Sequence, residues 1–298
     1  MDFKQIEAFV NVVKYESFSK AADASFLTQP TISSHIGTLE KELGQRLINR
    51  NGKKAFPTKQ GRILYKYAVN MLNTREKAIF SLESCKHEID GVLEIQASSI
   101  PAGYIVPGLM AKFREEYPRV QFYMEQSDSR KVEDNLLEQK GEIGFLGYRG
   151  NAALNYEKIM TDTMVLITPN NDKFRSLTGK PISPEYFISE PFVWREQGSA
   201  TRKEFEAAIH SMGYDPKKLN IAVRVNSLEV IKQAVGKGLG VSVVSRIAVE
   251  SSLSCERFLS FSIEGIEIDR EFYLVWNKTT ALSPTAETFK NFVLKSTL

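Results

Sequence analysis

The stretch SFSKAADASFLTQPTISSHIGTLEKELGQRLINR, residues 17–50, places two helical patterns on either side of a short turn. Ile32, Ile36 and Leu39 recur at spacings of four and three residues, which is typical of one buried face of a helix. Thr28 precedes this pattern, and its hydroxyl suits the N-cap of the second helix. The stretch therefore predicts two short helices joined by a tight turn, with the second anchored by its apolar face.

The outer face of this second helix carries hydroxyl, amide and imidazole side chains. A glutamine can bond to adenine, and serine or threonine can bond to bases or phosphates. A helix also fits the major groove of duplex DNA, with its N-terminal residues closest to the bases. DNA recognition is one interpretation, and the ordinary solvated face of a small helical domain is the other.

A basic hairpin is predicted directly after this helix, over residues 46–57. Asn-Gly at residues 51 and 52 is a strong signal for the turn, and Arg50, Lys53 and Lys54 place positive charge around it. Clustered cations attract phosphates, so the hairpin favours DNA binding. Residues 58–85 again show helical spacing, and a long solitary helix usually packs against a partner. We therefore expect two chains to pair through it.

The composition bounds the class of protein. The chain has 298 residues, two cysteines, three histidines and a formal net charge of +3. Cys85 and Cys255 form no CxxC pattern, so the sequence predicts neither a disulfide scaffold nor a cysteine-based metal site. No signal-peptide pattern and no run of about 18 apolar residues occurs. We therefore expect a cytoplasmic protein without a membrane span.

After residue 91 the chain alternates between short apolar runs and helical patterns. Such alternation predicts a parallel sheet with crossover helices, followed by a second α/β unit. The predicted strands lie near 93–95, 120–126, 142–147, 164–168, 192–194, 221–225, 241–244 and 273–276, and the predicted helices near 105–117, 130–139, 200–212, 227–236 and 284–294.

The first 61 residues resemble the start of LysR-type transcriptional regulators. The similarity rests on Phe3-x-x-Ile6-x-x-Phe9, Ser17-Phe18-Ser19-x-Ala21-Ala22, Leu27-Thr28-Gln29-Pro30-x-Ile32-Ser33-x-x-Ile36, Leu39-Glu40-x-x-Leu43-Gly44-x-x-Leu47, and Arg50 followed by Pro57-Thr58-x-x-Gly61. Gly37, Pro30 and His35 depart from the commonest residues of the family. The order of parts in the rest of the chain also fits the family.

The resemblance implies an α/β protein with an N-terminal winged helix-turn-helix, a long linker helix and two Rossmann-like α/β subdomains resembling a periplasmic binding protein. The expected domains are a DNA-binding domain over 1–60, a linker (dimerisation) helix over 61–90 and an effector-binding domain over 91–298. Within the last, subdomain I would comprise about 91–162 plus 268–298, and subdomain II about 163–267.

The resemblance also implies partners: promoter DNA, a second copy in a dimer or tetramer, RNA polymerase and a small-molecule effector. Neither a cofactor nor a metal is expected. Arg50 with Lys53 or Lys54 would form the wing, while His35 could equally be a surface residue without a role. The expected DNA-binding residues are Ser19, Thr28, Gln29, Pro30, Thr31, Ser33, Ser34, His35, Arg50, Lys53, Lys54 and Thr58.

The effector site is expected between the subdomains, because open α/β sheets bind ligands at the carboxyl ends of their strands. Ser98 and Ser99 follow a strand and open a helix, which suits a small anion. Arg195 and Arg202 could pair with such an anion through two donors. Alternatively, the serines merely cap a helix and the arginines are solvated. The candidates are Ser98, Ser99, Ile100, Pro101, Ser127, Asp128, Gly147, Arg195, Gln197, Ser199, Thr201, Arg202 and Asn226, with Ser129 beside them.

An enzyme, or a non-regulatory small-molecule-binding protein with a helical N-terminal interaction domain, is the alternative function. Gly198-Ser199 lacks the GxSxG pattern, and the sequence contains no HExxH, P-loop or kinase motif. Glycines 236, 238 and 240 lie between a predicted helix and a predicted strand, which is the reverse of a nucleotide-binding fingerprint. We therefore expect a regulator.

Overall fold

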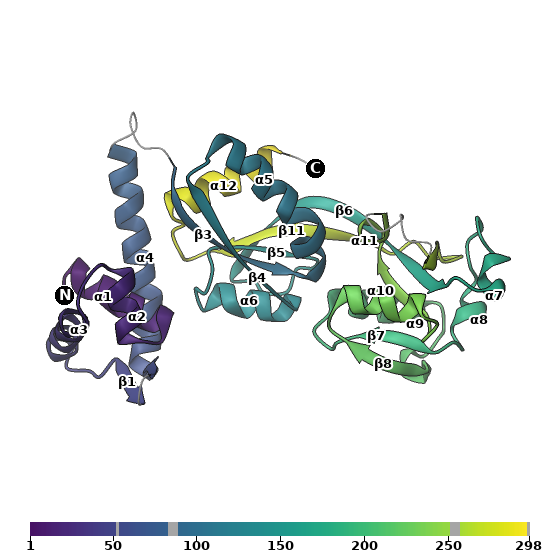
Figure 1. Ribbon diagram of the computed structural model, residues 1–298, viewed down its shortest axis with the longest axis horizontal. Helices are drawn as coiled ribbons and strands as arrows, with labels where there is room; N and C mark the ends of the chain where they lie inside the picture. Colours follow the sequence, from purple (N-terminus) through teal and green to yellow (C-terminus); the bar gives the residue numbers. More distant parts are fainter. Residues whose placement is uncertain (52–53, 83–88, 251–256, 297–298) are drawn as a thin grey trace.

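The computed structural model describes residues 1–51, 54–82, 89–250 and 257–296. Figure 1 shows an N-terminal helical head, a long helix α4 beside it, and two α/β lobes that follow in a row. No helix in these described ranges is long and apolar enough to cross a membrane.

The head is a three-helix bundle with a hairpin, and it contains the two short helices and the basic hairpin that the sequence predicted. Ser17 and Thr28 cap the second and third helices, since their hydroxyls accept the backbone N–H groups of Lys20 and Thr31. Gly44 ends the third helix in the left-handed conformation, with φ of 62°. The elements are α1 (Phe3–Tyr15), α2 (Phe18–Ala24), α3 (Gln29–Leu43), β1 (Ile48–Asn51) and β2 (Lys54–Pro57).

Thr58 and Gly61 attach α4 (Lys59–Leu82) to the hairpin. The Thr58 hydroxyl donates to the Arg46 carbonyl at 2.7 Å and accepts the Gly61 N–H at 3.0 Å. A Cβ atom at Gly61 would lie 2.1 Å from the Leu47 carbonyl oxygen, so this close approach requires glycine. The predicted long helix is thus confirmed as far as Leu82, and Cys85 lies outside the described residues.

Three amide side chains join α4 to the first α/β lobe. Asn70 donates to the Thr279 carbonyl and accepts the Ala281 N–H, while Asn73 donates to the Ala281 carbonyl at 2.8 Å. Gln139 donates back to the Lys66 carbonyl of α4 at 3.0 Å. Since these bonds run to backbone atoms on both sides, they fix the position of α4 along the lobe. We call this contact the amide seam.

The α/β part contains one mixed sheet that runs through both lobes. Its strand order is β10-β6-β11-β5-β3-β4, with β9 paired to β6, and β7 and β8 form a separate parallel pair. β3 is parallel to β4 and β5, as predicted, whereas β11 is antiparallel to β5 and β6. The strands are β3 (Gly91–Ser98), β4 (Val120–Ser127), β5 (Ile143–Leu146), β6 (Leu154–Pro169), β7 (Phe192–Arg195), β8 (Ile221–Val225), β9 (Ser242–Ser245), β10 (Phe258–Phe261) and β11 (Asp269–Asn277).

The helices of this part pack beside the sheet and connect its strands (Figure 1). They are the π-helix η1 (Pro101–Ile105), α5 (Val106–Glu116), α6 (Ser129–Leu137), α7 (Asp172–Arg175), α8 (Pro184–Phe187), α9 (Ala200–Ser211), the 3-10 helix η2 (Pro216–Lys218), α10 (Leu228–Gly236), α11 (Arg246–Glu250) and α12 (Pro284–Lys295).

Two predictions about the strands were wrong. The strand predicted at 164–168 is the last part of β6, a 16-residue strand, and β11 begins four residues before its predicted start. The first half of β6 mixes polar and apolar residues without a regular period and is largely half-buried or exposed, so it lacked the continuous apolar run of a buried strand. β10 was not predicted either. β6 and β11 together run from one lobe into the other (Figure 1).

The two lobes share part of their hydrophobic core. Ile95, Phe145 and Leu274 of the first lobe belong to the same buried cluster as Ile231 and Val244 of the second. A separate cluster fills the far side of the second lobe, around Phe192, Trp194 and Phe205. The lobes therefore differ from two independent domains on a flexible linker.

Candidate functional site

The recognition-helix candidate α3 presents its polar residues outward, while Ile32, Ile36 and Leu39 are buried against the head. Gln29, Pro30 and Ser34 are exposed, and Thr31, Ser33 and His35 are half-buried at the edge of the same surface. The groups that could reach a DNA groove therefore lie on the solvent side of the helix that the sequence predicted.

Arg50 connects the hairpin to this surface. Its Nη2 donates to the Ser33 hydroxyl at 2.9 Å, and its guanidinium carbon lies 4.3 Å from the centre of the Phe18 ring. The exposed arginine is therefore held in place beside α3 instead of being free in solvent. Lys54 is exposed on the same hairpin, while Lys53 lies outside the described residues.

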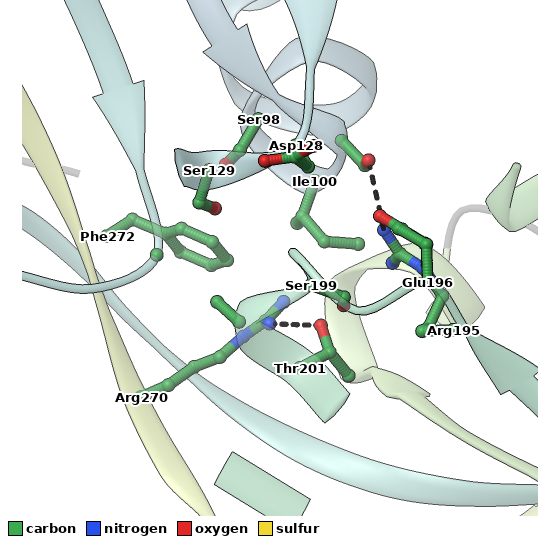
Figure 2. A pocket seen from close by; sticks show the side chains of 13 residues that line it. Ser98, Ile100, Asp128, Ser129, Arg195, Glu196, Ser199, Thr201, Arg270 and Phe272 are labelled. Atoms are coloured by element: carbon green, nitrogen blue, oxygen red, sulfur yellow. Dashed lines mark hydrogen bonds and ion pairs between the residues drawn. The ribbon is translucent and has the colours of Figure 1, made fainter. Parts of the chain in front are cut away.

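A cavity of about 20 Å³ lies between the two lobes. Figure 2 shows that residues from both lobes face it, with Ser98 and Ser129 on one side and Ser199 and Thr201 on the other. The lining comprises Ser98, Ser99, Ile100, Asp128, Ser129, Gly147, Arg195, Glu196, Ser199, Ala200, Thr201, Arg270 and Phe272.

Arg195 bridges the two lobes at this cavity. Its Nη2 donates to the Ser99 hydroxyl at 3.2 Å, and its Nε and Nη2 donate to the Glu196 carboxylate at 2.8 Å each. Gly198 also touches the opposite lobe, since a Cβ there would lie 2.6 Å from the Asp128 carboxyl carbon. The lobes are therefore in direct contact around the cavity.

Arg270 and two carboxylates form a buried charged cluster beneath the cavity. The Arg270 side chain is 2% exposed, its Nε lies 3.3 Å from the Asp162 carboxylate, and its Nη1 donates to the Thr201 hydroxyl at 2.7 Å. Burial raises the pKa of Glu204 to about 7, although the Arg270 guanidinium opposes this shift. Among the described residues, one oxygen of Glu204 and Nη2 of Arg270 are buried without a hydrogen-bond partner.

Comparisons with known proteins match both parts of the chain. Residues 3–62 match the model of the bacterial regulatory helix-turn-helix proteins of the lysR family, and residues 86–297 match the LysR substrate binding domain. The chain belongs to the LysR family of transcriptional regulators. A curated relative in the family, an uncharacterized HTH-type transcriptional regulator of Methanocaldococcus jannaschii, is 30% identical over 289 residues, which are 97% of each chain.

Two solved structures of LysR-type proteins have a similar fold. Full-length OxyR of Pseudomonas aeruginosa, solved as a variant, superposes with a TM-score of 0.82 at 19% identity and covers 100% of this chain and 97% of its own. Full-length CbnR complexed with its target DNA superposes with a TM-score of 0.58 at 17% identity, with both chains covered completely. The predicted architecture of a LysR-type regulator is therefore confirmed.

The structure separates the LysR-type DNA-contact candidates into two groups. Gln29, Pro30, Ser34 and the residues beside them lie on the outer surface of α3, and exposed Ser19 lies on neighbouring α2. The hydroxyls of Thr28 and Thr58 are engaged by the caps of α3 and α4. Both hydroxyls therefore have structural partners in the head itself.

The effector candidates are also brought together in part. Ser98, Ser99, Ile100, Asp128, Gly147, Arg195, Ser199 and Thr201 line the cavity, as does Ser129. Pro101, Ser127, Gln197, Arg202 and Asn226 are not part of its lining. Arg202 instead bonds to Glu206 at 2.8 Å and to the Arg195 carbonyl at 3.4 Å. Asn226 and Gln197 are exposed.

Sequence reasoning missed four residues of the lining: Glu196, Ala200, Arg270 and Phe272. Glu196 lies between two predicted residues, so its place could have been inferred. Arg270 and Phe272 lie at the start of β11, which is antiparallel to its neighbours. The prediction had considered only residues at the carboxyl ends of parallel strands. No pattern in the sequence indicates that β11 reaches the cavity, so these two residues were not identifiable before the structure.

Proposed function

We propose that this LysR-type regulator binds promoter DNA by inserting the N-terminal part of α3 into the major groove. Gln29, Thr31, Ser33, Ser34 and His35 would face the bases. Arg50 would contact the backbone from the hairpin, and contacts of that kind position a protein more than they specify sequence. The observation that carries this proposal is the outward polar face of α3 above a buried apolar stripe.

We also propose that two chains pair through α4. Ile63 and Tyr67 of this helix are 56% and 65% exposed, and they are separated by one helical turn. Large apolar side chains that recur on one exposed helix face favour a partner helix. A pair of chains would present two recognition helices to a two-fold symmetric DNA site, and two such pairs would form a tetramer.

The cavity between the lobes supports a small anionic effector as the regulating ligand. We propose that the protein acts through this ligand alone, without a further cofactor or a catalytic role. An effector that binds one arrangement of the lobes better than another shifts the population toward that arrangement. That shift would change how the regulator holds promoter DNA and contacts RNA polymerase. We place this activity in the cytoplasm, where the promoter is.

The test is an electrophoretic mobility shift assay with the promoter region upstream of the protein's own coding sequence. Gln29→Ala removes a potential pair of bonds to adenine, so we expect an affinity loss of about 10-fold or more. Ser33→Ala should weaken binding as well, because it also releases Arg50. Ser176→Ala removes an exposed hydroxyl directly after α7, far along the chain from the head; it is the matched control and should leave affinity unchanged.

Circular dichroism must show that all three variants fold. A loss of affinity then results from lost contacts with DNA and not from unfolding. Equal affinity of the wild type, Gln29→Ala and Ser33→Ala for this DNA would contradict the placement of α3 in the groove.

A further inference from the structure

Neither of the arginines predicted to bind the effector offers a free charge to the cavity. Arg195 makes two bonds to the Glu196 carboxylate, and its side chain is 6% exposed. Arg202 is paired with Glu206 and is absent from the cavity lining. Each of these guanidinium groups is therefore neutralised by a carboxylate next to it in sequence or one helical turn away.

Arg270 is also paired with a carboxylate, but one of its buried nitrogen atoms keeps no hydrogen-bond partner among the described residues. Its Nε bonds to Asp162, its Nη1 bonds to Thr201, and its guanidinium carbon lies 4.6 Å from the centre of the Phe272 ring. Asp162 is shared, since it also accepts bonds from the Ser245 hydroxyl and the Ile247 N–H. The guanidinium is thus fixed in place, while its buried Nη2 donates to no described group. An unsatisfied buried donor of a charged group is costly unless a ligand satisfies it.

Hydroxyl groups surround the same cavity. Ser98, Ser129 and Ser199 line it and are buried, and Thr201 already bonds to Arg270 (Figure 2). Two carboxylates also line the cavity, but Glu196 is paired with Arg195, and Asp128 accepts the Lys131 N–H at the start of α6. Hydroxyl and guanidinium groups donate hydrogen bonds to anions, whereas a cation would meet the guanidinium as a like charge. The volume of about 20 Å³ compares with about 10–15 Å³ needed for one water, so the site suits a compact ligand.

We infer that Arg270 is the cation that recognises the effector, and that the effector is a compact oxyanion which accepts a bond from Nη2 of Arg270. This inference rests on the proposed function of the cavity and identifies both the residue and the ligand class. It assigns the recognition of charge to β11, away from Arg195 at the end of β7 and Arg202 in α9.

The position of Arg270 also explains how such an anion would be sensed. Arg270 on β11 and Asp162 on β6 are direct partners across the two strands that connect the lobes. Thr201, the third member of the cluster, lies in the first turn of α9. A ligand bound to Nη2 therefore acts on both connecting strands and on α9 through a single guanidinium.

The experiment measures thermal stability and calorimetric binding of the full chain with sulfate, phosphate, acetate and citrate, at ionic strength matched with chloride. We expect sulfate or phosphate to raise the melting temperature, and citrate, which is too large, to have no effect. The double variant Arg270→Gln/Asp162→Asn removes both buried charges together and should lower anion affinity about 10-fold or more. Arg202→Gln is the matched control and should retain wild-type affinity.

Arg270→Lys provides a second variant if the double variant fails to fold. It keeps a positive charge opposite Asp162 but loses the planar fork and Nη2, so we expect a loss of about five-fold. Unchanged affinity in either variant, or tighter binding of citrate than of sulfate, overturns the inference.

Acetate distinguishes a planar from a tetrahedral ligand, and either result supports the inference. A wild type that binds promoter DNA but none of the compact anions overturns the inference while the regulator function stands. A wild type that binds the anions but fails to bind promoter DNA contradicts the proposed function instead.

Discussion

The proposed DNA-binding surface and the cavity between the lobes are built in opposite ways. The polar face of α3 comes from one continuous helix, is largely open to solvent, and receives a hydrogen bond from Arg50 of the hairpin. The cavity takes its side chains from β3, the start of α6, the β7–α9 loop and β11, and most of its polar lining is buried. A contiguous exposed surface depends on local structure alone, whereas a buried site depends on the packing of the whole domain.

The largest expected effect tests the buried side of this comparison. Asp162→Asn leaves the Arg270 guanidinium without its nearest carboxylate in a fully buried position. Breaking a buried ion pair costs about 3–5 kcal/mol of unfolding free energy, and we expect the low end because Glu204 lies close enough to ionise in compensation. Urea denaturation measures the unfolding free energy of the variant and the wild type. A loss below about 1 kcal/mol would show that the Arg270–Asp162 pair contributes no more than an ion pair at the surface.

The next effect tests the head. Gly61→Ala places a Cβ against the Leu47 carbonyl, so the hairpin or α4 must shift. Such overpacking costs about 1–3 kcal/mol, and we expect DNA affinity to fall while anion binding is unchanged. Gly108→Ala in α5, outside the head, is the matched control, because a Cβ at Gly108 meets no atom within 4 Å. Equal stability of Gly61→Ala and the wild type would contradict the close approach.

The smallest expected effect is a dependence on pH, because Glu204 is partly exposed and solvent screens much of its charge. Burial raises the pKa of Glu204 to about 7 in the folded protein, while its unfolded value is 4.5. Between these values the folded state binds more protons than the unfolded state, so stability falls as the pH rises through this window. Glu204→Gln removes this contribution.

We therefore expect the melting temperature of the wild type, relative to Glu204→Gln, to decrease between pH 5 and pH 8 in scanning calorimetry. Glu206→Gln, on the same helix, controls for the substitution itself. A wild type that gains stability over Glu204→Gln as the pH rises would show that Glu204 is better stabilised as an anion than its burial indicates.

The sequence predicted the head closely because its signals are local. Caps at Ser17 and Thr28, the stop at Gly44 and the apolar stripe through Ile32 each depend on neighbours within a few residues. The sequence predicted those cavity residues that lie at the carboxyl end of a parallel strand, as Ser98 does at the end of β3. Arg270 was missed because its role depends on antiparallel pairing with Asp162, 108 residues away in the chain. Arg202 pairs with Glu206 one helical turn later in α9. The sequence analysis did not consider this pair, and it therefore placed Arg202 at the cavity.

The amide seam has a mechanical consequence for the regulator. Asn70 and Asn73 bond to main-chain atoms of the segment between β11 and α12, and β11 itself begins at the charged cluster. A shift of that strand would therefore be passed to the middle of a helix of 24 residues. The head packs against the same part of α4, around Ala68 and Leu72, so it would move together with the helix. If two chains pair through α4 as proposed, the occupancy of the cavity would then alter the distance between their two heads.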